Sequence, residues 1–294
     1  MKQLVGPLLI LVCTVIWGSA FIAQKLGADH FGPFAINCYR NLLAGVFLAV
    51  CLAVRRRGRW NRAALVGGSL SGVVLFVAML TQQLGIERTT PGVSAFLTAN
   101  YVLLVPVLAW LVGRGRPGVG IWTGVALALS GTYFLCFPQT ASETFRLGGG
   151  EAWTLLCAVL FAVQIMVVDR FARDCDMLRF SLVQMVVAGL VALPFVFLPS
   201  ELARTSWQGF AEGVPALVYL GVFSSGIAYT LQNLGQARTP PALAAIIMAM
   251  ESVFGALFGW LLLGDLMTSR QLVGCGLVLA AVILSQLLPA RREV

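Results

Sequence analysis

Long apolar stretches alternate with short polar ones along the whole chain. Each stretch is close to the length of about 20 residues that an α-helix needs to cross a bilayer. The loops between the stretches are short and hold most of the charged residues. The pattern therefore predicts ten transmembrane helices, at residues 4–25, 34–54, 64–86, 92–112, 119–137, 152–169, 179–198, 213–235, 242–263 and 270–288.

The composition favours the same conclusion. Hydrophobic residues make up 59% of the chain and charged residues only 11%, whereas a soluble domain has roughly 25% charged residues. In water, a fold with this composition would expose a very large apolar patch. We therefore expect an all-α integral membrane protein whose main partner is the lipid bilayer.

The second half of the chain resembles the first. Residues 82–91 recur 150 positions later as residues 232–241, and both copies contain Leu-Gly-x-x-Arg-Thr-x-Pro. The first helix repeats at a slightly shorter spacing, which matches Trp17 to Phe161. Five helices fall in each half, so the second half must insert upside down. We predict two inverted five-helix repeats, at 1–143 and 144–294, that pack as one unit around a central cavity and are joined by the loop at 138–151.

Lysine and arginine are unevenly distributed between the loops. With the N terminus inside, fourteen of these residues lie on the cytoplasmic side and five on the outer side. This asymmetry predicts that both termini are cytoplasmic. It also accounts for the arginine run between Arg55 and Arg62 and for the net charge of +8, so no nucleic-acid partner is expected.

Several motifs resemble the EamA-type transporters of the drug/metabolite transporter superfamily. They are Trp-Gly-Ser-Ala-Phe at 17–21, Gly-Pro-Phe at 32–34, Arg40, and the stretch 251–265, which ends in Gly-Asp where the family usually has Gly-Glu. The acid that the family carries at the matching site of the first half is absent here. The resemblance covers the whole chain and implies ten helices, inverted repeats, a central cavity, and export of small metabolites across a bacterial inner membrane. It does not specify the substrate.

Glu251 is the sharpest candidate for a functional residue, because it lies near the middle of a predicted helix. An ionisable group at that depth is costly and usually faces a cavity or a partner. Two interpretations stay open: proton coupling or binding of a cationic substrate group, and a fixed internal ion pair or hydrogen-bonded acid. The repeat matches Tyr101 to Glu251 and Asn100 to Met250. We therefore expect Asn100, Tyr101 and Glu251 to converge on one substrate site, with a hydrogen bond to a neighbouring helix as the alternative for Asn100.

Arg40 lies about two turns into the second helix. A guanidinium can bind a carboxylate through two parallel hydrogen bonds, so Arg40 is a candidate anchor for an acidic substrate group. The alternative is a structural ion pair with Glu251. Lys25 lies at the outer end of the first helix, where it can contribute to a vestibule or simply extend to the membrane interface.

Other side chains are candidates for the cavity or its gates. Trp17 and Tyr229 are candidates for an aromatic wall and Gln164 for a polar contact, although core packing explains each of them as well. Two amide pairs near predicted helix ends are candidates for a vestibule or gate, with capping or interhelical hydrogen bonds as the alternative; they are Gln82 with Gln83 and Gln232 with Asn233.

The sequence gives little support for an enzymatic function. His30 is the only histidine, so neither a histidine-based triad nor a histidine-rich metal site can be assembled. The seven cysteines lie mainly in apolar segments without metal-ligand spacing, and no nucleotide-binding Gly-x-x-x-x-Gly-Lys loop occurs. We expect no catalytic residue, no metal and no cofactor.

These observations predict a secondary active transporter that works by alternating access. The expected substrates are small amphipathic metabolites, with amino acids or related compounds first and drugs as a further class, and protons are a candidate coupling partner. An uncoupled facilitator or channel for the same solutes is the main alternative, and a membrane enzyme or receptor is a further one. Ten helices can enclose a cavity in one chain, so a monomer suffices, and a dimer is compatible with the sequence.

Overall fold

The computed structural model describes residues 4–55, 58–88, 91–136, 148–205, 207–263 and 267–287, and these residues form helices and no strand. The first half contains α1 (Val5–Ala28), α2 (Pro33–Arg55), α3 (Arg62–Ile86), α4 (Pro91–Thr98), α5 (Tyr101–Leu111) and α6 (Val119–Cys136). The second half contains α7 (Gly149–Phe171), α8 (Met177–Ala192), the 3₁₀-helix η2 (Leu193–Phe197), α9 (Pro199–Leu202), α10 (Trp207–Val218), the π-helix η3 (Tyr219–Ala228), α11 (Tyr229–Gln236), α12 (Pro241–Met248), α13 (Met250–Leu263) and α14 (Ser269–Leu287).

Ten spans in the described part of the chain are long and apolar enough to cross a membrane. This confirms the predicted all-α membrane fold with ten transmembrane helices. Most of the predicted linker at 138–151 and the motif end at 264–265 lie outside the described residues.

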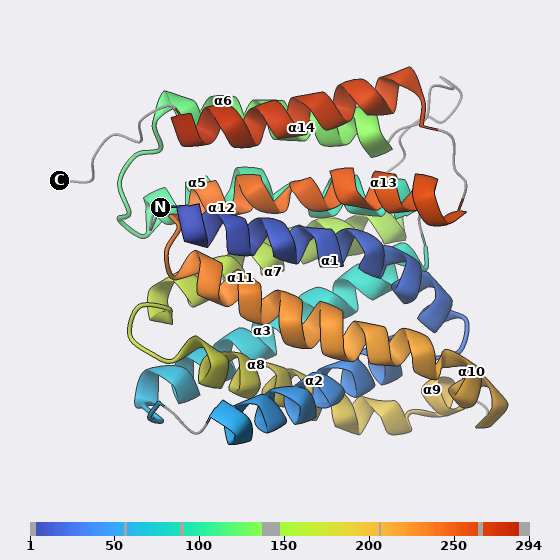
Figure 1. The fold of residues 1–294 in the computed structure, drawn as a ribbon. Helices are drawn as coiled ribbons and strands as arrows, with labels where there is room; N and C mark the ends of the chain where they lie inside the picture. The colour runs from blue at the N-terminus through green and yellow to red at the C-terminus, as the bar shows by residue number, and fades with distance from the viewer. Residues whose placement is uncertain are drawn as a thin grey trace.

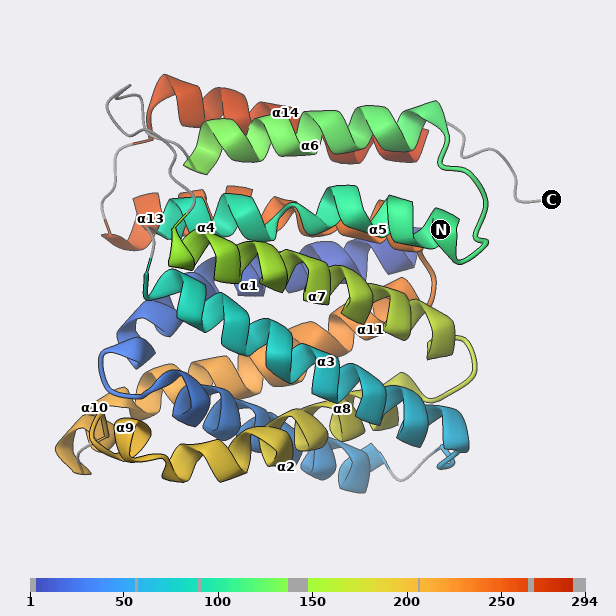
Figure 2. The same cartoon turned by 180° about the vertical axis from the view of Figure 1, so that it is seen from behind.

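The helices form five successive layers, and each layer contains one span from each half (Figures 1 and 2). The outermost layer at one edge is the pair α6 and α14. Next come α4–α5 with α12–α13, then α1 with α7, then α3 with the span that ends in α11, and finally α2 with α8. The pairs α6 with α14 and α2 with α8 pack directly, whereas α1 packs on α13 and α11, and α3 packs on α7 and α8. Every layer therefore pairs helices at equivalent places in the sequence repeat, while the inverted orientation of the halves stays a prediction.

Two spans are interrupted at equivalent positions. The fourth span breaks between Thr98 and Tyr101, and the ninth breaks at Ala249, 150 residues after Ala99. In the fourth span the amide of Asn100 donates to the carbonyls of Phe96 and Leu97, both at 3.1 Å, so the side chain competes with the helical backbone. Backbone hydrogen bonds still cross both breaks, from Val102 to Ala99 at 3.0 Å and from Ser252 to Ala249 at 3.2 Å, so each break is a local change of the helical turn.

The seventh and eighth spans differ from the predicted boundaries. The predicted helix at 179–198 ends as an α-helix at Ala192, and a 3₁₀ segment with Pro194 in its first turn follows; proline lacks the N–H that would continue the α-helical ladder. The predicted helix at 213–235 begins earlier, at Trp207, and becomes a π-helix between Tyr219 and Ala228. Hydrophobic periodicity does not distinguish these helix types, so it predicts neither the 3₁₀ segment nor the π segment.

Glycines bring α6 and α14 into close contact. A Cβ on Gly274 would lie 2.7 Å from the carbonyl oxygen of Gly131, and a Cβ on Gly131 would lie 2.7 Å from that of Gly274. Small residues allow this approach where hydrophobicity alone gives helices no reason to associate. Of the two glycines Gly274 and Gly276 on α14, only Gly274 packs in this way, because a Cβ on Gly276 would meet nothing within 4 Å.

We predict that Gly274→Val destabilises the folded protein by about 1–3 kcal/mol, because the added side chain forces α6 and α14 apart. Gly276→Val is the matched control on the same helix and should have little effect. Thermal unfolding of both variants in detergent measures the difference, and equal unfolding temperatures would contradict the assigned contact.

Candidate functional site

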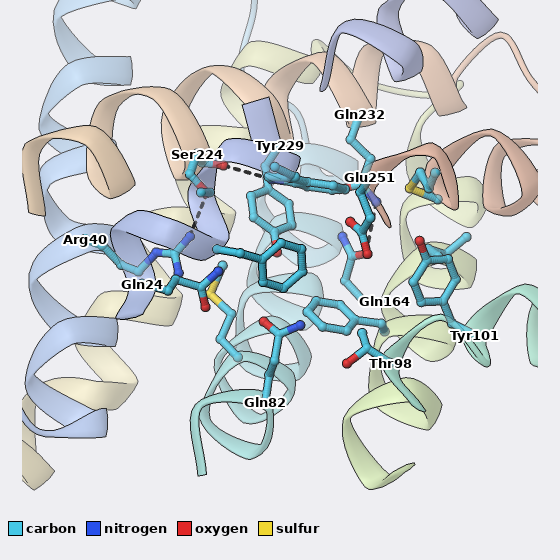
Figure 3. Close-up of a pocket in the computed structure, with 17 residues that line it drawn as sticks. Gln24, Arg40, Gln82, Thr98, Tyr101, Gln164, Ser224, Tyr229, Gln232 and Glu251 are labelled. Carbon is cyan, nitrogen blue, oxygen red and sulfur yellow. Dashed lines mark hydrogen bonds between the residues drawn. The ribbon is translucent and has the colours of Figure 1, made fainter. Parts of the chain in front are cut away.

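A central cavity lies between the halves, and seven of the ten spans line it. The centres of water-sized molecules can occupy about 50 Å³ of it, so a metabolite requires it to widen. Its lining, drawn in Figure 3, consists of Trp17, Ala20, Phe21, Gln24, Arg40, Met79, Gln82, Thr98, Tyr101, Phe161, Gln164, Ile165, Ser224, Tyr229, Gln232, Met248 and Glu251.

Fourteen of these seventeen residues form seven pairs at the spacings of the sequence repeat. The pairs are Trp17 with Phe161, Ala20 with Gln164, Phe21 with Ile165, Met79 with Tyr229, Gln82 with Gln232, Thr98 with Met248, and Tyr101 with Glu251. Gln24, Arg40 and Ser224 complete the lining. Equivalent residues of the two halves thus build a shared centre, and these three extend it in one direction.

Arg40 is buried on α2, with 5% of its surface exposed. Its Nε donates to the hydroxyl of Ser225 at 3.0 Å and one terminal nitrogen donates to the hydroxyl of Ser224 at 2.9 Å. No carboxylate of the described residues lies within 4 Å of the guanidinium. Arg40 therefore keeps donors and a full positive charge for a ligand.

Glu251 follows the break in the ninth span and lies in α13, 9% exposed. The ion pair with Arg40 that the sequence left open does not form. Figure 3 shows the two residues in separate parts of the cavity, Arg40 beside Ser224 and Gln24, and Glu251 beside Gln164 and Gln232. Within the described part of the chain, no cation lies within 4 Å of the Glu251 carboxyl. A buried carboxyl and a buried guanidinium thus face one cavity without ionic partners.

Aromatic side chains separate the two charged groups. The rings of Trp17 and Tyr229 lie 4.8 Å apart between centroids, tilted by 60°. The indole of Trp17 donates to the carbonyl of Ser224 at 3.1 Å, which joins α1 to the π-helix. The hydroxyl of Tyr101 is buried and has no hydrogen-bond partner among the described residues, so it is available to a polar substrate group.

A buried layer of amides and hydroxyls closes the cavity on the predicted cytoplasmic side. Gln232 donates to Gln164 at 3.3 Å and to Gln236 at 3.1 Å. Next to this chain, Asn233 donates to Gln184 at 2.8 Å and to Ser181 at 2.9 Å, and Gln184 donates to Ser71 at 3.0 Å. These bonds join α3, α7, α8 and α11, and hence both halves.

Four candidates from the sequence do not line the cavity. Asn100 bonds within its own span rather than converging with Tyr101 and Glu251. Gln83 is buried beside the cavity, Asn233 belongs to the polar layer, and Lys25 is exposed in the last turn of α1. Their amide neighbours Gln82 and Gln232 line the cavity.

Sequence reasoning missed Gln24 and Ser224 as cavity residues. Gln24 directly precedes Lys25, and a polar side chain within an apolar predicted helix was the available signal. Ser224 gave no local signal, because its placement depends on the π-helix.

At the predicted outer end, Glu201 accepts a hydrogen bond from the Ala35 backbone N–H at 3.0 Å. Burial raises the pKa of the Glu201 carboxyl, and backbone hydrogen bonds oppose the shift.

Ion pairs join the two halves at both ends of the bundle. Arg114, after α5, lies 2.5 Å from Asp169 of α7 at the predicted cytoplasmic end. Arg204, after α9, lies 3.2 Å from Glu87, after α3, at the predicted outer end. Both ends of the cavity are thus bridged by contacts that motion of one half against the other would break.

The chain is similar to proteins described as transporters. It is 29% identical, over 97% of its own length and 87% of the relative, to an uncharacterized transporter of Archaeoglobus fulgidus. It is 27% identical to a WAT1-related chloroplastic protein of Arabidopsis thaliana, over 91% of the chain and 66% of that relative. A solved crystal structure superposes with a TM-score of 0.81 at 18% identity, covering 96% of both chains, and supports the fold.

The EamA-like transporter family model matches the chain twice, at residues 4–137 and 148–287. These two matches together span most of the sequence, and each covers five of the ten spans. The protein is a multi-pass membrane transporter, and its chain belongs to the EamA-like transporter family.

Proposed function

We propose that the protein is a secondary active transporter that exports small amphipathic metabolites, with amino acids as the leading class. It works by alternating access in a bacterial inner membrane, with both termini in the cytoplasm. One observation carries the proposal: Arg40 and Glu251 are buried in one cavity, and neither has an ionic partner among the described residues. A buried guanidinium without a counter-charge is costly, and a buried carboxyl avoids that cost only by keeping its proton. A ligand with a charge of each sign would compensate the guanidinium and also the carboxylate that forms when the proton leaves.

The arrangement of the lining supports a zwitterionic substrate. Its carboxylate would bind the free guanidinium donors of Arg40, which Ser224 and Ser225 hold in place. Its ammonium group would lie near Glu251, and its apolar part against Trp17 and Tyr229. In this pose the guanidinium, the carboxyl and the aromatic side chains of the cavity each contact a different part of the substrate.

The asymmetry of the cavity supports alternating access. Gln24 and Gln82 lie about one turn from the predicted outer ends of α1 and α3. The repeat equivalents of Gln24 and Arg40 are Val168 and Gln184, which are fully buried on the predicted cytoplasmic side. We infer that exchange of the two halves' conformations would open that side through Val168 and Gln184 and close the outer side.

Glu251 is the proposed coupling residue. A carboxyl that lies in a water-accessible cavity in one state, and binds an ammonium group in the other, can release a proton as it takes up substrate. Competition between proton and substrate for one carboxylate would couple the two fluxes. The alternative is a facilitator for the same solutes, in which Glu251 binds the substrate but carries no proton.

We expect Glu251→Gln to abolish transport driven by a pH gradient and to retain passive exchange. Purified protein in proteoliposomes would be tested with a pooled panel of amino acids and related metabolites, with and without an imposed gradient. Glu212→Gln is the control, because it removes an exposed acid at the predicted outer end. Equal, pH-indifferent transport by wild type and Glu251→Gln would exclude the coupling role and leave a facilitator.

We expect Arg40→Gln to raise KM for amino acids about 10- to 100-fold, because a hydrogen bond to a charged group contributes about 1.5–3 kcal/mol. Uptake of the corresponding amines, which lack the carboxylate, should change little. Arg88→Gln is the control, since Arg88 is exposed and donates to the Leu84 carbonyl of α3. A similar loss for amines and amino acids would contradict the assigned carboxylate contact.

We expect the double variant Gln184→Ala, Asn233→Ala to favour the inward-open state, because it removes the hydrogen bonds that join α8 to α11. In a cysteine-free background, a cysteine at position 168 should react faster with a small thiol reagent, and one at position 24 more slowly. Unchanged labelling at both positions would contradict a gate at the polar layer.

A further inference from the structure

A second hollow lies at the predicted cytoplasmic end, bounded by the end of α2, the connection from α7 to α8, and α11. Arg55, Arg173, Arg238 and Asp176 line it together with apolar side chains such as Leu234. The centres of water-sized molecules can occupy about 550 Å³ of this open groove, against about 50 Å³ of the central cavity. It can therefore admit a bulky group without widening.

The groove carries an excess of positive charge. Its lining has three guanidinium groups and one carboxylate. That carboxylate, Asp176, is already held by Arg55 at 3.0 Å and by Arg179 at 2.9 Å, and it also accepts from the backbone of Leu178. The nearby Asp174 faces Arg170 at 3.8 Å. The acids around the groove are thus engaged by other groups and leave it electropositive.

Two of the arginines are available to a ligand. Arg173 is exposed and makes no ion pair or hydrogen bond within the described residues. Arg238 is exposed and donates to the carbonyl of Leu234 at 2.8 Å, which holds its side chain along α11. Both stand at the ends of membrane spans, two residues beyond α7 and α11 respectively.

Apolar surface adjoins the charged groups. Leu234 and Met177 line the groove, and Val54, next to Arg55, has 79% of its surface exposed. A ligand with an anionic head and an apolar tail matches this combination better than a purely polar anion does. Basic pockets between helices at the cytoplasmic surface have the chemistry that binds anionic lipid headgroups.

We propose that this groove binds the phosphate headgroup of an anionic phospholipid through Arg173 and Arg238, with Arg55 at its edge. The assignment of the groove to the cytoplasmic leaflet rests on the orientation in the proposed function. A bound headgroup would join α2, the α7–α8 connection and α11. Because α11 also carries Tyr229 and Gln232 of the central cavity, the lipid stabilises the arrangement in which the polar layer is closed.

The test uses full-length protein in neutral detergent, with thermal unfolding and native mass spectrometry as readouts. Phosphatidylglycerol should raise the Tm and remain bound to the wild-type protein, and phosphatidylcholine should do neither. The double variant Arg173→Gln, Arg238→Gln should lose both effects. The matched control Arg59→Gln, Arg62→Gln removes two exposed arginines from the same end, outside the groove, and should retain them.

Equal lipid responses in the Arg173/Arg238 variant and the wild type would overturn the proposal. The same rise in Tm with inorganic phosphate alone would also overturn it, because the groove would then be a site for a soluble anion. If the double variant does not fold, Arg173→Gln alone serves, since it removes no contact within the described residues. Neither readout requires transport, so the result is independent of whether the substrate proposal holds.

Discussion

The cost of holding a guanidinium inside an apolar bundle shapes the centre of this structure. Arg40 is kept there by two neighbouring serine hydroxyls, and both belong to a π-helix. In an α-helix, consecutive side chains diverge by about 100°, whereas the wider π turn changes where each side chain points. Trp17 in turn bonds a carbonyl of that π-helix. The π-helical conformation, the position of the Trp17 ring and the position of the Arg40 charge therefore depend on one another, and none of them can change alone.

The sequence alone predicted the ten spans, because their lengths and apolar composition follow directly from the solvent. The depth of Glu251 in a predicted helix identified it as a candidate, and the repeat then led to Tyr101; both residues follow equivalent breaks and line the cavity. Asn100 could not be placed, because its side chain is satisfied by its own backbone, and a pattern of residue types carries no information on that choice. Ser224 was hidden for a related reason: its position depends on a helix type that hydrophobic periodicity does not report.

The two halves share a design but differ in charge. The cavity centre is built from paired positions, yet Arg40 is matched by Gln184 and Glu251 by Tyr101. A symmetric site would treat the two sides of the membrane alike. Here the first half supplies the cation and the second half the acid, so the zwitterionic substrate that we propose would bind in one preferred direction. The polar layer around Gln184 is closed by neutral hydrogen bonds, which are easier to break and remake than ion pairs in a low-dielectric interior.

The hydrogen bond from the Trp17 indole to the Ser224 carbonyl has a consequence for ligand selectivity. A ligand that stacks on the indole and displaces it must break this bond, so its free energy of binding includes a change in the π-helix. Binding of such a ligand and the conformation of the π-helix are then coupled equilibria. By thermodynamic linkage, a change that shifts the conformation of that helix also changes the affinity for such a ligand. Substitutions along η3 that never touch the substrate can therefore discriminate between aromatic and aliphatic solutes.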